Sequence, residues 1–177
     1  MQALEMLFTR KTSRSFLPQT ISEQELQTLL KAACAAPVGL GKFESVHLTV
    51  VENAELLAQI TANTVNKSGR KNYPFYGAQT VIFISAAPSP RFSDLPMANA
   101  CCIAENILLA ATEQGLGSVI MLGFVPELKA NSDLLAHLNL PAGKELQIAV
   151  AVGKILEPLG ERQVNLDKIS TNYIRYV

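Results

Sequence analysis

The segment Thr80–Ala86, with the sequence TVIFISA, restricts the possible folds of this chain more than any other. Its apolar residues follow one another without the alternation of a half-exposed strand, which predicts a strand covered by helices on both faces. Periodicity predicts further strands at 46–51, 118–122 and 147–154, and helices at 2–9, 22–36, 54–65, 97–115 and 126–138. Strands that alternate with helices predict a three-layer α/β or α+β core.

The size and charge of the chain exclude several classes of protein. A chain of 177 residues has room for one full domain, so we treat residues 1–177 as a single unit. Its 15 Lys and Arg balance 15 Asp and Glu, which argues against a nucleic-acid binder or a membrane-surface protein. We find no signal peptide and no membrane-spanning run, and we expect a cytoplasmic protein.

The cysteines and histidines do not predict a metal site or a disulfide framework. Cys34, Cys101 and Cys102 form no CxxC pair, and we expect all three to be buried thiols in a reducing compartment. His47 and His137 stand far apart in the chain, and neither has a ligand-spaced neighbour. Satisfied structural histidines are the preferred interpretation.

The predicted helix 97–115 has an unusually wide apolar face. At 100° per residue this face covers about 220°, which indicates a central helix. Packing on its counterpart in a homodimer and burial inside a monomer explain the pattern equally well. Residues 168–177 carry apolar side chains without a partner in their own segment, and they predict an arm that pairs elsewhere, with another subunit as one option. The polar residues of the helix form one stripe: Asn99, Glu105, Asn106, Thr112 and Glu113.

Two segments could carry chemistry, although the chain has no GxGxxG, Walker or GxSxG motif. Arg10, Lys11 and Arg14 place three cations within five residues, beside the hydroxyl of Thr12, a composition suited to a phosphate. A solvated basic turn is the simpler interpretation of composition alone. Residues 115–124 predict a strand that ends in glycine. The end of a strand is where α/β proteins expose backbone N–H groups to ligands, but a glycine after a strand also marks a simple turn.

Five segments in the same order resemble the FMN-dependent nitroreductase family, in its small-type branch. They are RKTSRSF at 10–16, SEQELQTLLKAACAAP at 22–37, YGAQTVIFISA at 76–86, AENILLAATEQGLGSVIMLGF at 104–124 and VGKILEP at 152–158. The resemblance implies a three-layer α+β fold with a mixed central sheet flanked by helices. It also implies an interlocked homodimer with an exchanged C-terminal arm and two FMN sites at the interface.

The same resemblance implies the residues that hold FMN, and it implies no catalytic side chain and no metal, because the flavin carries the chemistry. A backbone N–H at Leu122 would point at flavin N5, and the missing Cβ of Gly123 would permit close approach, so that bulk there would displace the flavin. The implied cofactor-binding residues are Arg10, Lys11, Thr12, Arg14 and Arg162 around the phosphate and pyrimidine, Ile120, Met121, Leu122 and Gly123 along the ring, and Pro37, Val38 and Gly39 from the partner subunit.

The chain departs from the family after Pro37, where it reads APVGLGKFES. Gly41, Phe43 and Ser45 replace the asparagine, glutamine and tryptophan of many relatives, and Lys42 and Phe43 become candidates for the substrate side. The implied activity is that of an FMN-dependent NAD(P)H oxidoreductase. It would take a hydride from NADH or NADPH through flavin N5 and reduce nitroaromatic, quinone or flavin acceptors in a ping-pong scheme.

Two other functions remain open. The altered loop and the missing tryptophan would also suit a flavin-binding or redox-responsive protein without turnover, which a steady rate of NAD(P)H oxidation would exclude. Nucleic-acid binding through the basic segments is disfavoured by the neutral charge and the few aromatics. The basic run at 67–71 is interpreted as a solvated loop, or as a reader of the extra phosphate of NADPH.

Overall fold

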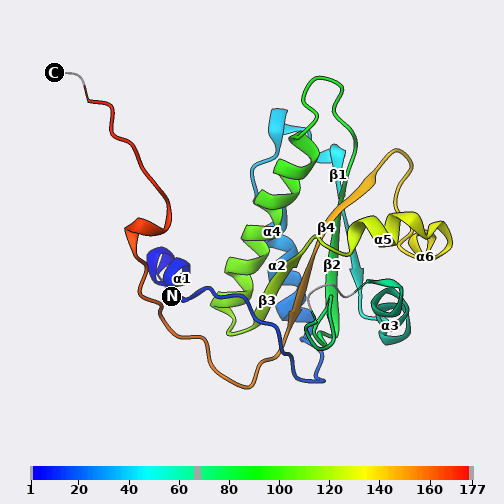
Figure 1. The fold of residues 1–177 in the computed structure, drawn as a ribbon, viewed down its shortest axis with the longest axis horizontal. Coiled ribbons are helices and arrows are strands. Elements are labelled where there is room, and N and C mark those ends of the chain that lie inside the picture. The colour runs from blue at the N-terminus through cyan, green and yellow to red at the C-terminus, as the bar shows by residue number, and fades with distance from the viewer. Residues whose placement is uncertain (1, 66–68, 176–177) are drawn as a thin grey trace.

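The computed structural model describes residues 2–65 and 69–175. These residues contain one sheet of four strands, whose arrangement Figure 1 shows. The strand order is β1-β2-β4-β3, and all three neighbouring pairs are antiparallel. The expected mixture of parallel and antiparallel strands is therefore not found among these four strands. Among the described residues, the parallel pairing is an isolated bridge between Thr12 and Ser118. The strands are β1 (Val46–Val51), β2 (Thr80–Ala86), β3 (Gly117–Met121) and β4 (Glu145–Gly153).

Helices cover both faces of the sheet, so the predicted three-layer arrangement is confirmed (Figure 1). On one face lie α2 (Glu23–Cys34) and α4 (Leu95–Glu113), which pack against each other, and α4 packs against the central strands. On the other lie α3 (Ala54–Asn63), α5 (Val125–Ala130) and α6 (Ser132–Ala136). The helix α1 (Ala3–Thr9) precedes this core, and short 3-10 turns occur at Gly39–Gly41, Phe43–Ser45 and Leu166–Lys168.

The strand β2 divides its side chains between two cores, as its continuous apolar run predicts. Every residue of β2 is buried. Ile82 and Ile84 join the core under α2 and α4, whereas Val81 and Phe83 join the core under α3, α5 and α6. Burial of both faces explains why this strand has no polar alternation.

Most predicted element bounds agree with the structure to within two residues, and one predicted helix is divided. The segment 126–138 forms two short helices, α5 and α6, with Asn131 between them. The Asn131 side chain accepts a hydrogen bond from the Leu134 backbone N–H at 3.1 Å and so caps the second helix. Asparagine favours such a cap over a helix interior, and the helix restarts there.

The polar stripe predicted for α4 is wrong in part. Asn99 and Thr112 are buried, at 5% and 2% exposure, because the Asn99 side chain bonds to another loop and the Thr112 hydroxyl donates to the Leu108 carbonyl. By length and composition alone α4 could cross a membrane. Half of the apolar window is buried against the rest of the chain, which identifies α4 as a core helix of the domain.

The prediction of buried thiols is also wrong. All three cysteines are exposed in this chain. Cys101 and Cys102 lie on the outer face of α4, while the sheet and α2 cover its inner face, which includes Ala100 and Ile103. Cys34 is the last residue of α2, where the helix leaves the core.

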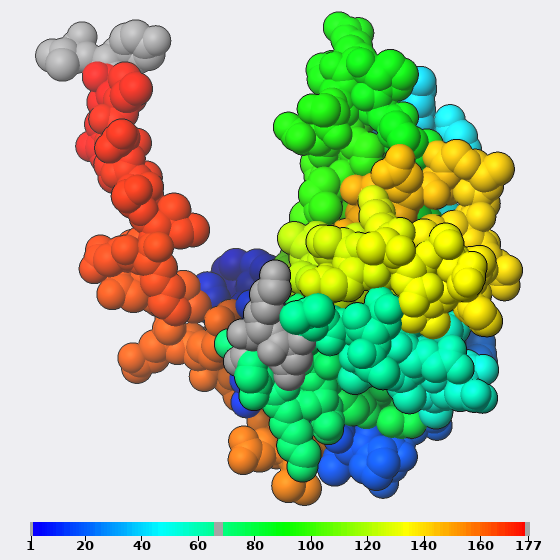
Figure 2. Space-filling view, turned by 45° about the vertical axis from the view of Figure 1, so that its right-hand side comes forward, coloured from blue at the N-terminus to red at the C-terminus, as the bar shows by residue number. Residues whose placement is uncertain are grey.

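The C-terminal segment leaves the body of the molecule, as the predicted arm requires. After β4 ends at Gly153, the described residues form no further strand or α-helix, and the segment projects outward (Figure 1). In space-filling view the arm stands clear of the body over most of its length (Figure 2). Its large apolar side chains are therefore uncovered, among them Leu166, Ile169 and Ile174 at 89%, 77% and 92% exposure.

Candidate functional site

The basic segment 10–14 lies along the free edge of β3. The Ser13 backbone N–H donates to the Ser118 carbonyl at 2.9 Å, and Thr12 forms the parallel bridge to the same residue. Ser13 is buried, whereas Thr12 and Arg14 are exposed. Because side chains alternate along an extended segment, this register directs Thr12 and Arg14 to the same open side.

A glycine on β3 makes this close approach possible. A Cβ atom at Gly117 would lie 2.8 Å from the Ser13 hydroxyl oxygen and would overlap the side chain of Ile155. Beside this contact lies a cavity of about 450 Å³, lined by residues 11–15 and 155–157. The segment after β4 thus forms the second wall of the space above the basic residues.

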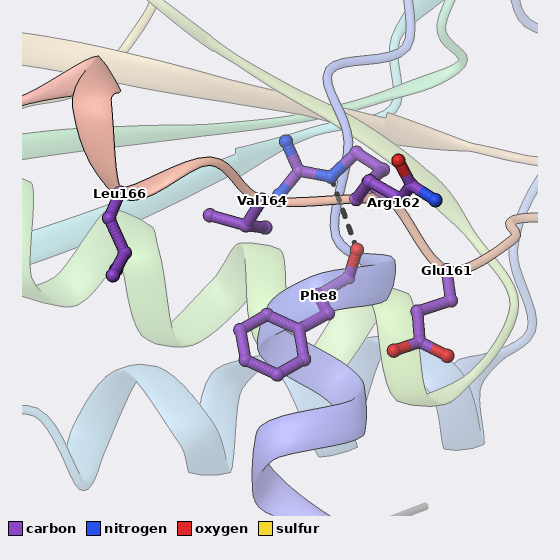
Figure 3. Close-up of a pocket in the computed structure, with 6 residues that line it drawn as sticks. Phe8, Glu161, Arg162, Val164 and Leu166 are labelled. Atoms are coloured by element: carbon purple, nitrogen blue, oxygen red, sulfur yellow. Dashed lines mark hydrogen bonds between the residues drawn. The ribbon is translucent and has the colours of Figure 1, made fainter.

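Arg162 lies beside the start of the basic segment and is held by the C-terminal end of α1. Its Nε donates to the Phe8 carbonyl at 3.2 Å (Figure 3). Its Nη2 donates to the Leu7 carbonyl at 3.3 Å. A cation at a helix C-terminus is favourable because the last carbonyls are unpaired. A cavity of about 660 Å³ is lined here by Phe8, 161–164 and Leu166. Part of the donor capacity of Arg162 is therefore used within the chain.

Arg10 is a further cation at the C-terminal end of α1. It follows the last residue of α1, and its Nε lies 3.7 Å from a carboxylate oxygen of Glu105 on α4. The pair is partly exposed, at 22% and 46% for the two side chains, so its net energy is small. The guanidinium of Arg10 keeps further donors for an anion.

The end of β3 adds an apolar surface to this cationic group. Val119 and Met121 are buried, whereas Ile120 and Leu122 are 37% and 52% exposed. Ile120 lies only two residues beyond Ser118, the residue that binds the basic segment. The basic segment 10–14 therefore meets β3 at Ser118, two residues before the exposed apolar end of the strand begins at Ile120.

The remaining predicted residues lie elsewhere in the chain. The loop 37–43 packs at the N-terminal end of α4, away from the basic segment (Figure 1). The Gly39 N–H donates to Asn99 Oδ1 at 2.9 Å, and this bond fixes the loop to the helix. Lys42 and Phe43 are exposed, Phe43 at 53%. The predicted site residues therefore form two separate groups in one chain. One group comprises residues 10–14, 120–123 and 162, and the other comprises residues 37–43.

The sequence model of the nitroreductase family matches residues 7–154 of this chain. The chain belongs to this family. It is similar to a protein of Archaeoglobus fulgidus that carries the provisional name NADH dehydrogenase/NAD(P)H nitroreductase. The two are 29% identical over 153 residues, which cover 86% of this chain and 84% of the relative.

Solved nitroreductase structures have the same fold. An FMN-dependent nitroreductase of Clostridium difficile gives a TM-score of 0.77 at 25% identity and covers 97% of this chain and 99% of its own. A nitroreductase of Bacteroides fragilis, crystallised with bound FMN, gives a TM-score of 0.79 at 23% identity over 98% of this chain and 100% of its own. These matches confirm the nitroreductase-like α+β fold.

Two side chains of this nitroreductase-family chain, Glu25 and Tyr73, have shifted pKa values. Burial alone raises the pKa of Glu25, but bonds from Lys154 and from Ser22 outweigh it and lower that pKa below 4.5. The Lys154 Nζ lies 2.5 Å from the Glu25 carboxylate, at the point where β4 leads into the cavity wall. Burial raises the pKa of Tyr73 above 10.0, and the nearby Tyr76 and Glu127 add to the shift, against the opposing effect of Arg70.

Three residues near the site were missed by the sequence analysis. Asn99 was assigned to a solvent-facing stripe, and nothing in the sequence links it to Gly39, sixty positions away. The Lys144 Nζ donates to the carbonyls of Glu44 and Val46, at 2.6 and 2.7 Å, and supports the same loop. Tyr73 lies against Gly123, a contact that no motif indicates.

The predictions about a metal site and about the basic loop 67–71 can be compared only with the residues that the structure describes. Within residues 2–65 and 69–175, no cluster of three His, Cys, Asp or Glu side chains could hold a metal ion. The predicted basic loop 67–71 includes Lys67 and Ser68, which lie outside the described residues.

Proposed function

We propose that this chain is an FMN-dependent NAD(P)H oxidoreductase that reduces nitroaromatic, quinone or flavin acceptors. The observation that carries the proposal is the meeting of the cationic segment 10–14 with the exposed apolar end of β3. FMN has the matching halves, because it joins a doubly charged phosphate to a planar ring. We also place the reaction in the cytoplasm, where both nicotinamides are available.

The donor set fits the phosphate half. Arg10, Lys11 and Arg14 supply cationic donors, and the exposed Thr12 hydroxyl lies on the same side as Arg14. Arginine and hydroxyl groups form short charge-assisted bonds to phosphate oxygens. Arg162 adds a cation to the same region, although its bonds to α1 make it a support for the segment as well as a ligand.

The end of β3 fits the ring half. Ile120 and Leu122 offer apolar contact, and the backbone from Ile120 to Gly123 offers polar groups at the edge of the sheet. Bound FMN would supply the redox chemistry, taking a hydride from NAD(P)H and passing two electrons to the acceptor. The chain's own groups would bind and orient the cofactor and would need no acid or base of their own.

The proposal includes a homodimer in which Pro37, Val38 and Gly39 of one chain complete the site of the other. Two observations support it. The loop that holds these residues lies away from segment 10–14 within one chain (Figure 1). The arm, the loop residue Leu40 and the α1 residue Leu4 all expose large apolar side chains, which a second copy would cover.

The experiment is a titration of the apo-protein with FMN, followed by anaerobic addition of NADPH and then NADH. We expect a flavin absorbance band that bleaches with either or both nicotinamides. Arg14→Ala is expected to weaken FMN binding about 10- to 100-fold, the effect of one charge-assisted bond. Arg91→Ala is the matched control. Arg91 is an exposed arginine that lies over the ring of Phe92, far from segment 10–14 in the sequence.

The outcomes separate the proposal from its rivals. A bound flavin that neither NADPH nor NADH bleaches would favour a flavin-binding protein without turnover. Equal FMN affinity in the Arg14 and Arg91 variants would show that segment 10–14 does not hold the phosphate. Absence of FMN binding by the wild-type chain would refute the proposed function.

A further inference from the structure

Tyr73 reaches the end of β3 from a separate turn of the chain. A Cβ atom built on Gly123 would lie 2.5 Å from the Tyr73 phenol oxygen, while the ring carbon Cζ would be 3.8 Å away. The hydroxyl is therefore the part of the side chain that meets Gly123. The space left by the missing Cβ is occupied by a hydrogen-bonding group beside the exposed side chain of Leu122.

The turn that carries Tyr73 is fixed by its own bonds. The Tyr76 N–H donates to the Asn72 carbonyl at 2.6 Å, and the Ala78 N–H donates to the Phe75 carbonyl at 3.0 Å. The Tyr73 ring meets the buried Tyr76 ring edge-to-face, with centroids 6.0 Å apart. Such a contact restricts the ring orientation, so the hydroxyl position is determined by the fold.

Aromatic packing ties this turn directly to the end of β3. The ring of Phe75 lies 5.3 Å from that of Phe124, and both are buried, at 2% and 0% exposure. Phe124 follows Gly123 in the chain. The hydroxyl of Tyr73 and the backbone at 122–123 are thus anchored to the same cluster and keep their relative position.

The phenol remains a donor over the working range of pH. Burial, together with the nearby Tyr76 and Glu127, raises the Tyr73 pKa, so the neutral O–H form persists at pH 7. Tyr73 is nevertheless only partly buried. A neutral O–H group that a ligand can reach donates a hydrogen bond to an oxygen acceptor.

We propose that the Tyr73 hydroxyl is a ligand-binding group of the site at the end of β3 and donates a hydrogen bond to an oxygen atom on a bound planar ring. The inference rests on the proposed function, because the ring is either the carbonyl-bearing ring of FMN or that of a quinone or nitroaromatic acceptor. Both sources present the same chemistry, an exocyclic oxygen at the edge of an aromatic system. The hydroxyl then orients this ring against the backbone of Leu122 and Gly123.

The test compares Tyr73→Phe with wild type in the full-length protein, since this change removes only the hydroxyl. One experiment measures the Kd for FMN by fluorescence quenching of the flavin. The other measures kcat/KM for a quinone and for ferricyanide, which offers no ring oxygen. Tyr76→Phe, the neighbouring tyrosine on the same turn, is the control, and the thermal unfolding of each variant reports on the fold.

A threefold or larger loss of FMN affinity or of quinone kcat/KM in Tyr73→Phe identifies the source of the oxygen. We expect roughly a five- to tenfold loss, as for one hydrogen bond. A raised FMN Kd points to the flavin carbonyl. A reduced quinone kcat/KM with an unchanged FMN Kd and an unchanged ferricyanide rate points to the acceptor.

The inference is overturned if Tyr73→Phe changes both the FMN Kd and the quinone kcat/KM by less than threefold, while wild type binds FMN and its flavin is reduced by NAD(P)H. That result leaves the proposed function intact. It is also overturned if Tyr76→Phe produces the same losses, because these would then arise from the turn rather than the hydroxyl. Failure of wild type to bind FMN refutes both proposals together.

Discussion

Substitution of Gly123 by alanine tests the contact on which the end of β3 depends. The new methyl group would lie 2.5 Å from the Tyr73 oxygen, about 0.9 Å closer than the 3.4 Å at which ordinary contacts begin. The Tyr73 ring cannot turn away freely, because it packs edge-to-face on Tyr76. Relief therefore requires movement of the ring or of the chain at 123, and we expect the change to cost about 1–2 kcal/mol of unfolding free energy.

The second substitution Tyr73→Phe should restore the lost stability. Without the hydroxyl, the nearest ring atom to the new methyl group is Cζ at 3.8 Å, an ordinary contact. We therefore expect the double variant to recover to within about 0.5 kcal/mol of Tyr73→Phe alone, with a coupling energy of roughly 1–2 kcal/mol.

The assay is urea unfolding of the four apo-proteins at one protein concentration, followed by circular dichroism. Omitting FMN removes the stabilisation that a ligand adds, and a fixed protein concentration prevents differences in concentration from changing the contribution of association. In a thermal melt of the same apo-proteins, Gly123→Ala should unfold about 2–8 °C below wild type.

Two results would refute this reasoning. Equal stability of wild type and Gly123→Ala would show that the hydroxyl does not restrict position 123. A double variant as unstable as Gly123→Ala would show that the glycine is required for another reason. Loss of FMN binding by Gly123→Ala without loss of apo-protein stability would instead support the expectation that bulk there displaces the flavin.

Three other predictions follow from single contacts. Asn99→Ala leaves the Gly39 N–H without its partner and is expected to weaken FMN binding several-fold in a titration, because the loop 37–39 loses its position; unchanged affinity would exclude this loop from the site. Glu25, with its lowered pKa, contributes stability that is present above pH 4.5 and lost as pH falls through its folded pKa, so Glu25→Gln should be less stable at pH 7 and show a smaller loss in urea unfolding below pH 4.5. If α4 lies at the interface of the proposed homodimer, Cys101, which is exposed in one chain, should react slowly with a bulky maleimide, and fast modification with the dimer intact by size-exclusion chromatography would show that α4 is not the interface.

The fold could be predicted where a local pattern has a single explanation. The continuous apolar run of β2 admits only burial on both faces, and the structure places its residues alternately in two cores. The start of α2 is likewise local, because Ser22 and Glu25 form a capping box in which the Ser22 hydroxyl accepts from the Glu25 N–H. Both signals depend on residues that are neighbours in sequence.

The polar residues of α4 could not be placed by the same reasoning. Periodicity assigned Asn99 to a solvent-facing stripe, since an amide side chain is costly to bury without a partner. The partner exists, but it is the backbone of Gly39, which reaches α4 only after the chain has folded. The exposed Cys101 shows the converse, because an apolar residue on a helix faces the core only if another element covers that face.

The candidate site divides in the same way. The cations of segment 10–14 were visible in the composition, and the resemblance to nitroreductases joined them to the end of β3. The Ser13–Ser118 bond shows how the two segments meet in the fold. Tyr73 could not be found, because its approach to Gly123 depends on the shape of a turn fifty positions earlier in the chain.

The dimensions of the C-terminal arm favour a second copy as its binding partner. The arm is held to α1 through Arg162, and from Gln163 to Arg175 it can extend to roughly 43 Å, at about 3.3 Å per residue. The helix α4, with 19 residues, is only about 28 Å long. An arm of this reach can cross the outer face of α4 and continue onto a neighbouring subunit. Covering the exposed Leu166, Ile169 and Ile174 on a second copy would add hydrophobic stabilisation that one chain does not provide, since the arm stands clear of its own body over most of its length (Figure 2).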